Sequence, residues 1–115
     1  MKTDKSPLSG GTAMLILKLL DEKDMYGYQI IVELSRRSQD IFNLKTGTLY
    51  PLLHGLEKDG MITSYDQCAG NGRVRRYYKL TGNGSELLYT KLSEWDCYVK
   101  AVDGVIKGGE QYATA

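Results

Sequence analysis

Residues 46–58 read Thr-Gly-Thr-Leu-Tyr-Pro-Leu-Leu-His-Gly-Leu-Glu-Lys, and the fold is best worked out from this stretch. Four leucines recur at separations of three, one and three residues, the spacing of a short amphipathic helix: Leu49, Leu52, Leu53 and Leu56. The opposite side is polar and carries Thr46, Thr48, Tyr50 and His54. Asp59 and Gly60 end the helix. We therefore expect a helix that packs through its leucines and offers a compact polar face.

Two further helices are expected on the N-terminal side of this stretch. Residues 26–37 have apolar positions at helical spacing and two arginines at the end, where the helix dipole favours cations. Residues 8–20 are apolar on nearly every side, which is typical of a buried helix. A polar break at 21–24 and a turn at 38–45 separate the three helices.

A β-hairpin is expected on the C-terminal side. Residues 61–66 and 74–80 have strand character, and 74–80 alternate between two faces. Gly70-Asn71-Gly72 supplies the tip. Four basic residues fall within seven positions that contain no acid: Arg73, Arg75, Arg76 and Lys79. Guanidinium groups on such a hairpin are well suited to bind phosphate.

The last expected helix, residues 81–106, carries the most regular apolar pattern of the chain. Six positions are separated by four, three, four, three and four residues: Leu88, Leu92, Trp95, Val99, Val102 and Ile106. This stripe could fold back on the first helix of the same chain. It could instead form a homodimer seam, which we favour because an uncovered stripe of this length would be a liability in water. Residues 108–115 are expected to be a frayed tail.

The order helix, helix, helix, hairpin, long helix predicts a mainly α (α+β) fold, a winged helix-turn-helix with a long C-terminal dimerisation helix. Residues 1–80 would form the DNA-binding domain and 81–107 the dimerisation helix. In such a module the third helix enters the major groove of double-stranded DNA and the hairpin reaches nearby phosphates. The expected DNA contacts are Lys45, Thr46, Thr48, Tyr50, His54, Arg73, Arg75 and Tyr77.

Three blocks carry a resemblance to a known family. They are YGYQI at 26–30, GTLYPLLHGLE at 47–57 and GRVRRYYKLT at 72–81. Together they are similar to the PadR family of bacterial transcriptional regulators over about residues 8–107. The resemblance implies a dimeric repressor that binds an inverted-repeat operator and is released by a small molecule. The single C-terminal helix resembles the compact, multidrug-sensing subgroup, in which a Trp on this helix faces its dimer mate across an apolar pocket. Trp95 matches that Trp, so a planar aromatic effector is expected at Trp95, Leu92, Val99 and Leu15.

The chain departs from the family pattern at several positions. Lys45-Thr46 replaces the Ser-Pro pair that usually opens the recognition helix, so Thr46 is expected to be the N-cap. Gly82 and Gly84 replace better helix formers in the first turn of the last helix, at an expected cost of up to about 1 kcal/mol each.

Composition restricts the remaining function classes. The formal net charge of +1 argues against a polyanion partner until the chain is divided. Residues 35–80 hold eight Lys or Arg against four Asp or Glu, and the remainder holds seven against ten. The surplus of basic residues thus coincides with the expected DNA-binding segment. A protein-interaction module with a basic wing remains the alternative, to be separated by the salt dependence of binding to DNA.

Other classes have less support from the residues. Catalytic spacings and a phosphate-cradling glycine loop are missing from the sequence, so we expect no enzyme. Cys68 and Cys97 are far apart and have only His54 as a histidine partner, which gives no support to a metal site or a disulfide framework, and we expect no cofactor. The longest apolar run is too short to cross a bilayer, and no signal peptide is evident, so a cytoplasmic protein is expected.

Overall fold

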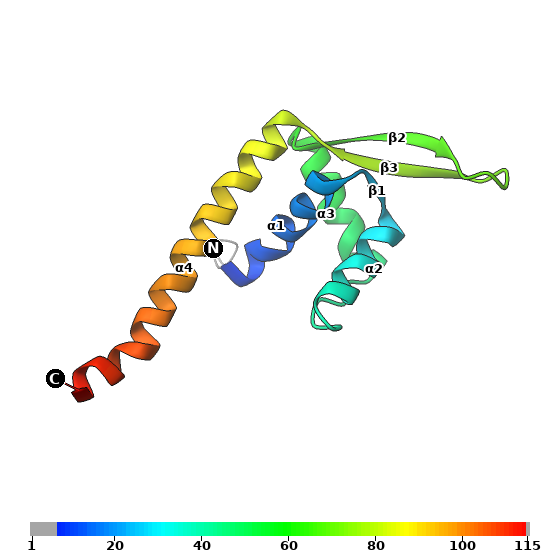
Figure 1. The fold of residues 1–115 in the computed structure, drawn as a ribbon. Coiled ribbons are helices and arrows are strands. Elements are labelled where there is room, and N and C mark those ends of the chain that lie inside the picture. Colours follow the sequence, from blue (N-terminus) through cyan, green and yellow to red (C-terminus); the bar gives the residue numbers. More distant parts are fainter. Residues whose placement is uncertain (1–6, 115) are drawn as a thin grey trace.

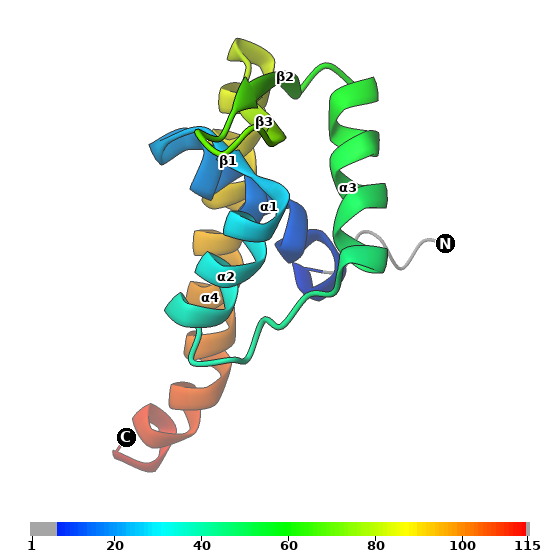
Figure 2. The same cartoon turned by 90° about the vertical axis from the view of Figure 1, so that its right-hand side faces the viewer.

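The computed structural model describes residues 7–114, with the side chains of residues 11–108. The elements follow in the order α1 (Pro7–Glu22), β1 (Met25–Tyr26), α2 (Gly27–Arg37), α3 (Thr46–Lys58), β2 (Ile62–Cys68), β3 (Val74–Leu80) and α4 (Gly82–Thr114) (Figure 1). This is the winged helix-turn-helix with a long C-terminal helix that the sequence predicts. In Figure 2 the loop after α2 runs between the lower ends of α2 and α3.

The sheet has one strand more than expected. Its order is β1-β3-β2, and both pairs are antiparallel. The strand β1 occupies two residues that lie at the start of the expected second helix, and α2 therefore begins at Gly27. In the register, Tyr77 of β3 lies between Tyr26 of β1 and Tyr65 of β2. The sheet thus connects the hairpin directly to the start of α2.

A single hydrophobic core joins three helices, the sheet and the beginning of α4. Its members are buried and come from each of these elements: Met14, Ile16, Leu17, Leu19, Leu20, Met25, Ile30, Leu34, Leu49, Leu53, Ile62, Tyr78 and Leu88. The α1 helix contributes the most because it is apolar on several sides. Of the two adjacent tyrosines on β3, Tyr78 points into this core.

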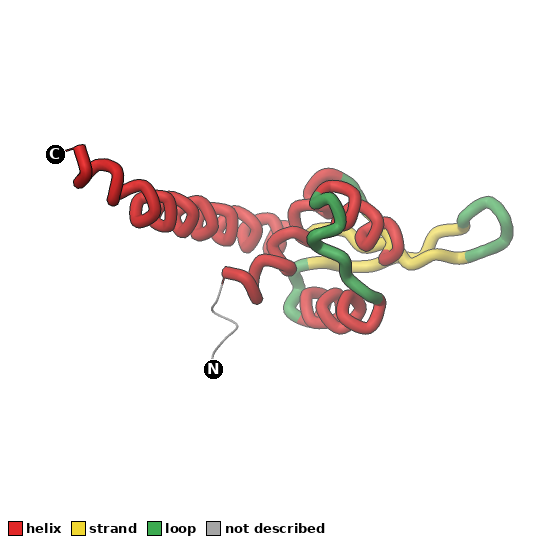
Figure 3. Tube along the Cα trace, turned by 90° about the horizontal axis from the view of Figure 1, so that it is seen from below, coloured by secondary structure: helices red, strands yellow, loops and turns green. Residues whose placement is uncertain are grey.

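The outer part of α4 projects from the rest of the molecule (Figures 1 and 3). The radius of gyration is 17.4 Å, whereas a compact domain of this length has about 13 Å. We call α1 to β3 together with α4 up to Leu88 the head, and α4 from Tyr89 onward the stalk. The frayed tail expected at 108–115 stays a prediction, although α4 is described to Thr114. Apart from Gly108 and Gly109, residues 108–114 are compatible with a helix; Ala115 lies outside the described residues.

A tight joint attaches α4 to the head. The Thr81 hydroxyl lies 2.6 Å from the carbonyl oxygen of Gly60 and accepts a hydrogen bond from the Gly84 amide at 3.0 Å. A Cβ on Gly84 would collide with the Met61 carbonyl and lie 2.7 Å from Cδ1 of Leu80. Gly84 is therefore required by this close approach, and its poor helix propensity is offset by the fit.

Candidate nucleic-acid interface

The α3 helix turns one side to the core and the other to solvent. Leu49 and Leu53 are fully buried. The residues expected to contact DNA from this segment are all exposed: Lys45, Thr46, Thr48, Tyr50 and His54. The N-cap is Lys45 rather than Thr46, because Lys45 has extended backbone angles and its carbonyl accepts the Leu49 amide at 2.9 Å. Thr46 is thus the first helical residue, and its hydroxyl is exposed.

Tyr50 has a packing role in addition to its exposed edge. It is 36% exposed, and its ring lies against Gly27, the buried first residue of α2. A Cβ at position 27 would come within 2.7 Å of Cζ of Tyr50. The contact fixes α3 on α2 and explains why a glycine follows Tyr26. The sequence blocks at 26–30 and 47–57 therefore meet in space.

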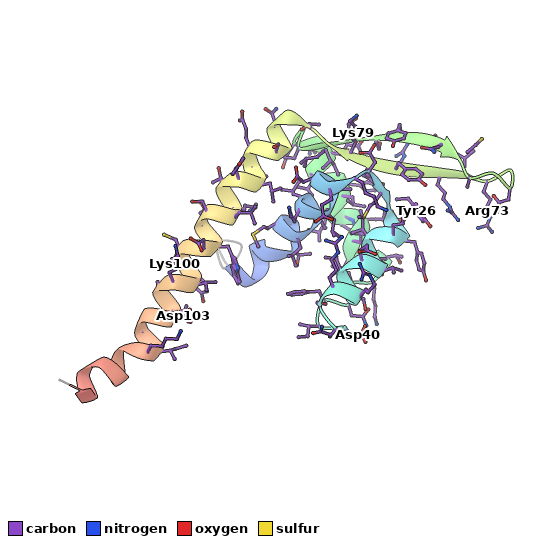
Figure 4. All side chains as sticks on the ribbon, viewed as in Figure 1. Tyr26, Asp40, Arg73, Lys79, Lys100 and Asp103 are labelled. Carbon is purple, nitrogen blue, oxygen red and sulfur yellow. The ribbon has the colours of Figure 1, made fainter. Side chains whose placement is uncertain are left out.

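The hairpin, which we call the wing (residues 62–80), presents Arg73 near its tip (Figure 4). Gly70 and Gly72 have φ of +77° and +81°, values that glycine adopts without strain. The Arg73 amide donates to Oδ1 of Asn71 at 3.3 Å, and the Arg73 side chain is exposed. The sharp turn thus points a guanidinium group into solvent beyond the sheet.

Two of the other basic residues of the wing, Arg75 and Arg76, are engaged within the chain. Arg76 lies 3.7 Å from Asp66 across the hairpin. Arg75 is half-buried, with its guanidinium carbon 4.4 Å from the centre of the Tyr26 ring. Tyr77, also half-buried, has its ring between those of Tyr26 and Tyr65. The structure thus separates Arg73, which is exposed, from Arg75 and Tyr77, which are engaged within the chain.

The two arginines at the end of α2 are held by acids. Arg37 contacts Glu22 of α1 at 2.7 Å and Glu33 at 2.9 Å, and Arg36 contacts Glu33 at 2.8 Å. The hydrogen bonds from Arg36 and Arg37 lower the pKa of Glu33 from its ordinary 4.5 to about 2. The Arg37–Glu22 pair joins α1 to α2 at the surface of the head, and the other two pairs lie within α2.

The apolar stripe on α4 is divided between the head and the stalk. Leu88, which is expected in the dimer seam, is 4% exposed and belongs to the core of its own chain. The reason is that the first turns of α4 pack on α1. Farther along, Leu92, Trp95, Val99 and Ile106 are exposed and Val102 is half-buried. The fold-back alternative therefore applies to the first turns of α4, and the homodimer seam stays a prediction for the rest of the stripe.

Trp95 is flanked by further aromatic surface. Its ring stacks on that of Tyr98, with centroids 5.8 Å apart. Leu15, the expected fourth member of the effector pocket, is half-buried on α1 and packs against the core. A cleft of about 410 Å³ lies elsewhere, lined by residues 20–24, the end of β3 and the first turn of α4.

The described residues contain no group of three or more metal-ligating side chains. Both cysteines are free and exposed. Among the helices of residues 7–114, none is long and apolar enough to cross a membrane.

A short helix with an exposed polar face, held by a second helix and followed by a basic wing, defines a winged helix-turn-helix DNA-binding protein. A family model described as the transcriptional regulator PadR-like family matches residues 16–90. The chain belongs to this family and is a DNA-binding transcriptional regulator, not an enzyme. Membership implies dimerisation as well as DNA binding.

Individual relatives match between 64% and 90% of this chain. An uncharacterised protein of Lysinibacillus sphaericus is 35% identical over 90% of this chain and 94% of its own length. A transcriptional regulator of Mycobacterium tuberculosis is 38% identical over 64% of each chain. A solved PadR-like transcriptional regulator of Bacillus cereus has a TM-score of 0.78 at 25% identity and covers 88% of this chain and 96% of its own.

Proposed function

We propose that this chain is a homodimeric repressor that binds an inverted-repeat operator and is released by a planar aromatic effector. The observation that carries the proposal is the exposed, compact polar face of α3: Lys45, Thr46, Thr48, Tyr50 and His54. Hydroxyl and imidazole groups can approach base edges closely, and Lys45 at the helix start suits a phosphate. As a DNA-binding regulator, the protein would act in the cytoplasm.

The wing adds contacts that do not depend on base sequence. Arg73 is exposed near the tip and suits a phosphate beside the groove that α3 enters. Arg75 and Tyr77 lie closer to the sheet, so their contribution to DNA binding would be through the shape of the wing or through their outer edges.

The stalk supports the dimeric part of the proposal. Leu92, Trp95 and Val99 lie on one side of α4 and are each more than a third exposed. Val102 and Ile106 extend the same stripe. A second stalk would cover this surface, and two-fold symmetry would place two copies of α3 on two half-sites. Residues 1–80 would then act as the DNA-binding unit and 81–107 as the dimerisation helix.

The proposed effector site lies where the two stalks meet. Trp95 offers an indole face, with Leu92 and Val99 beside it and Leu15 on α1. A flat aromatic molecule between two such faces would stack favourably. Because Trp95 is the single tryptophan of the chain, its fluorescence reports this site directly. Quenching by a planar aromatic that also releases DNA supports the site, whereas release without quenching places the effector elsewhere.

Substitutions on α3 test the DNA-binding face. Thr48→Ala combined with His54→Ala removes two exposed polar side chains of α3 and leaves Tyr50 packed on Gly27. Operator affinity should fall about ten-fold, equivalent to about 1.4 kcal/mol, with thermal stability nearly unchanged. Thr90→Ala, at an exposed position of the stalk, is the matched control. Equal affinity for the double variant and the control would contradict the assignment.

A further inference from the structure

Three tyrosines from three strands form one connected cluster, which we call the tyrosine brace: Tyr26, Tyr65 and Tyr77. The rings of Tyr65 and Tyr77 are stacked, with centroids 5.8 Å apart and an angle of 14° between them. Tyr26 meets Tyr77 edge to face, with centroids 5.4 Å apart. Residues paired directly across neighbouring strands share a face of the sheet. The three rings therefore lie on the face opposite to Tyr78 and the core.

Two polar contacts tie the brace to its surroundings. The Tyr65 hydroxyl donates to Oδ2 of Asp24, in the turn between α1 and β1, at 2.6 Å. The Arg75 guanidinium lies over the Tyr26 ring at 4.4 Å, within the range of a cation–π contact. The segment 24–26 is thus held by both strands of the wing.

The brace continues into the helix-turn-helix. Tyr26 is followed at once by Gly27, the first residue of α2. Gly27 in turn lies against Tyr50, which stands on the exposed side of α3. A short line of contacts, Arg75 to Tyr26 and Gly27 to Tyr50, therefore connects the wing with the recognition helix.

The brace also gives two neighbouring arginines different surroundings. Arg73 is exposed near the tip, whereas Arg75, two residues closer to the sheet, is half-buried on Tyr26. A guanidinium that stacks on a ring inside its own chain stiffens the hairpin and leaves the tip arginine to reach outward.

We propose that Tyr26 is a positioning residue for DNA binding: through Arg75 and Tyr77 it holds the wing at a fixed angle to α3, so that wing and recognition helix engage one DNA site together. Tyr26 itself contacts no DNA in this account. The inference rests on the proposed role of the wing in phosphate binding.

The test compares Tyr26→Leu, which removes the ring, with Tyr26→Phe, which keeps it. The operator affinity of Tyr26→Leu should fall about three- to ten-fold, and the slope of log affinity against log salt should be lower by about one. Tyr26→Phe should stay within about two-fold of the unsubstituted protein, because the ring carries the contacts. Tyr89→Leu, an exposed tyrosine on the stalk, is the control for the substitution itself.

A second readout needs no DNA. Cys68 at the end of β2 is free and exposed, so a spin label can be placed on each wing of the dimer in a Cys97→Ser background. The distance distribution between the two labels should broaden in Tyr26→Leu and stay narrow in Tyr26→Phe. Tyr65→Phe, at a surface position, removes only the bond to Asp24 and should broaden the distribution less. This variant loses one contact of the brace and keeps the ring stack. A distribution as narrow as that of the unsubstituted protein would therefore count against the brace even if Tyr26→Leu unfolds.

The outcomes separate this inference from the proposed function. If Arg73→Ala lowers the salt slope but Tyr26→Leu changes neither the slope nor the label distances, the positioning role is overturned. An equal loss in Tyr26→Phe and Tyr26→Leu would also overturn it, because it would assign the effect to the hydroxyl. If Arg73→Ala leaves the slope unchanged while Tyr26→Leu broadens the distances, the wing's phosphate contact fails and the brace stands.

Discussion

The head encloses a core of buried apolar side chains, whereas the apolar stripe of the stalk is largely exposed. In the head, residues from every helix and strand share one core, and the joint at Thr81 and Gly84 attaches α4 to it. In the stalk, Leu92, Trp95 and Val99 have no such cover within the described part of the chain. The apolar stripe of α4 runs through both regions, so the difference lies in what packs against α4. The head is complete within one chain, and we propose that a second stalk covers the exposed stripe.

The two regions also carry different surfaces. The head presents hydroxyls on α3 and an arginine on the wing, while the stalk presents aromatic and branched apolar groups. Such a division suits a regulator in which one region binds DNA and the other couples two copies. The following substitutions alter one region and leave the other in place.

The largest effect is expected from Val99→Asp. A carboxylate in the proposed dimer seam would be buried without a partner, at a cost of several kcal/mol. The variant should sediment as a monomer and lose about 100-fold or more in operator affinity, because the two heads would no longer bind together. Ala101→Asp, on the opposite side of α4, should remain a dimer. A dimeric Val99→Asp would place the interface elsewhere.

Gly84→Ala tests the joint between the regions. The added methyl group would collide with the Met61 carbonyl, and we expect the free energy of unfolding to fall by about 1–3 kcal/mol. Gly104→Ala, in the stalk, has open space around the new methyl group and should stabilise the helix by up to about 1 kcal/mol. Thermal or urea unfolding measures both. Changes of the same sign would show that the fit at Gly84 is looser than described.

Arg73→Ala addresses the wing. Loss of one exposed guanidinium should lower the salt slope of DNA binding by about one and weaken all sequences alike. Lys100→Ala on the stalk, where Lys100 pairs with Asp96 at 2.9 Å, should leave the slope unchanged. Fluorescence anisotropy over a series of salt concentrations gives both slopes. Identical slopes for the two variants would remove the wing from the DNA interface.

The smallest expected effect is in the ion pairs of the head. The pKa of Glu33 is lowered from 4.5 to about 2, so its carboxylate stabilises the head above about pH 4.5, and this contribution is lost as the pH falls toward 2. Melting temperatures should therefore drop more between pH 5 and pH 2.5 in the unsubstituted protein than in Glu33→Gln. The same drop in both would show that the arginines hold Glu33 less firmly.

The order of helices and the wing could be predicted from the sequence because periodicity reports them directly. The leucines of α3 and the alternation of β3 are local patterns. The strand β1 has two residues and therefore no period, and its existence depends on pairing with Tyr77 and Tyr78. The roles of Gly27 and Gly84 also depend on distant residues, Tyr50 and Met61.

The helical spacing of the apolar stripe does not determine which partner covers each residue. Leu88 and Leu92 are equivalent in spacing, yet Leu88 is in the core of the head and Leu92 is exposed. Spacing identifies the side of a helix that is covered, but the partner depends on where α1 ends against α4. Arg73 and Arg75 also look equivalent in the sequence. They differ in the structure because Arg75 lies over the Tyr26 ring.

The most direct test of two heads joined through their stalks is the spacing of the DNA half-sites. Footprinting on the region upstream of its own gene should give two protected half-sites whose centres are about 34–36 Å apart, one helical turn, or a multiple of it. Inserting half a helical turn, about five base pairs, should lower the affinity about 100-fold or more, because one head would then face away from its half-site. Unchanged affinity after this insertion would contradict the account, since the heads would be binding independently.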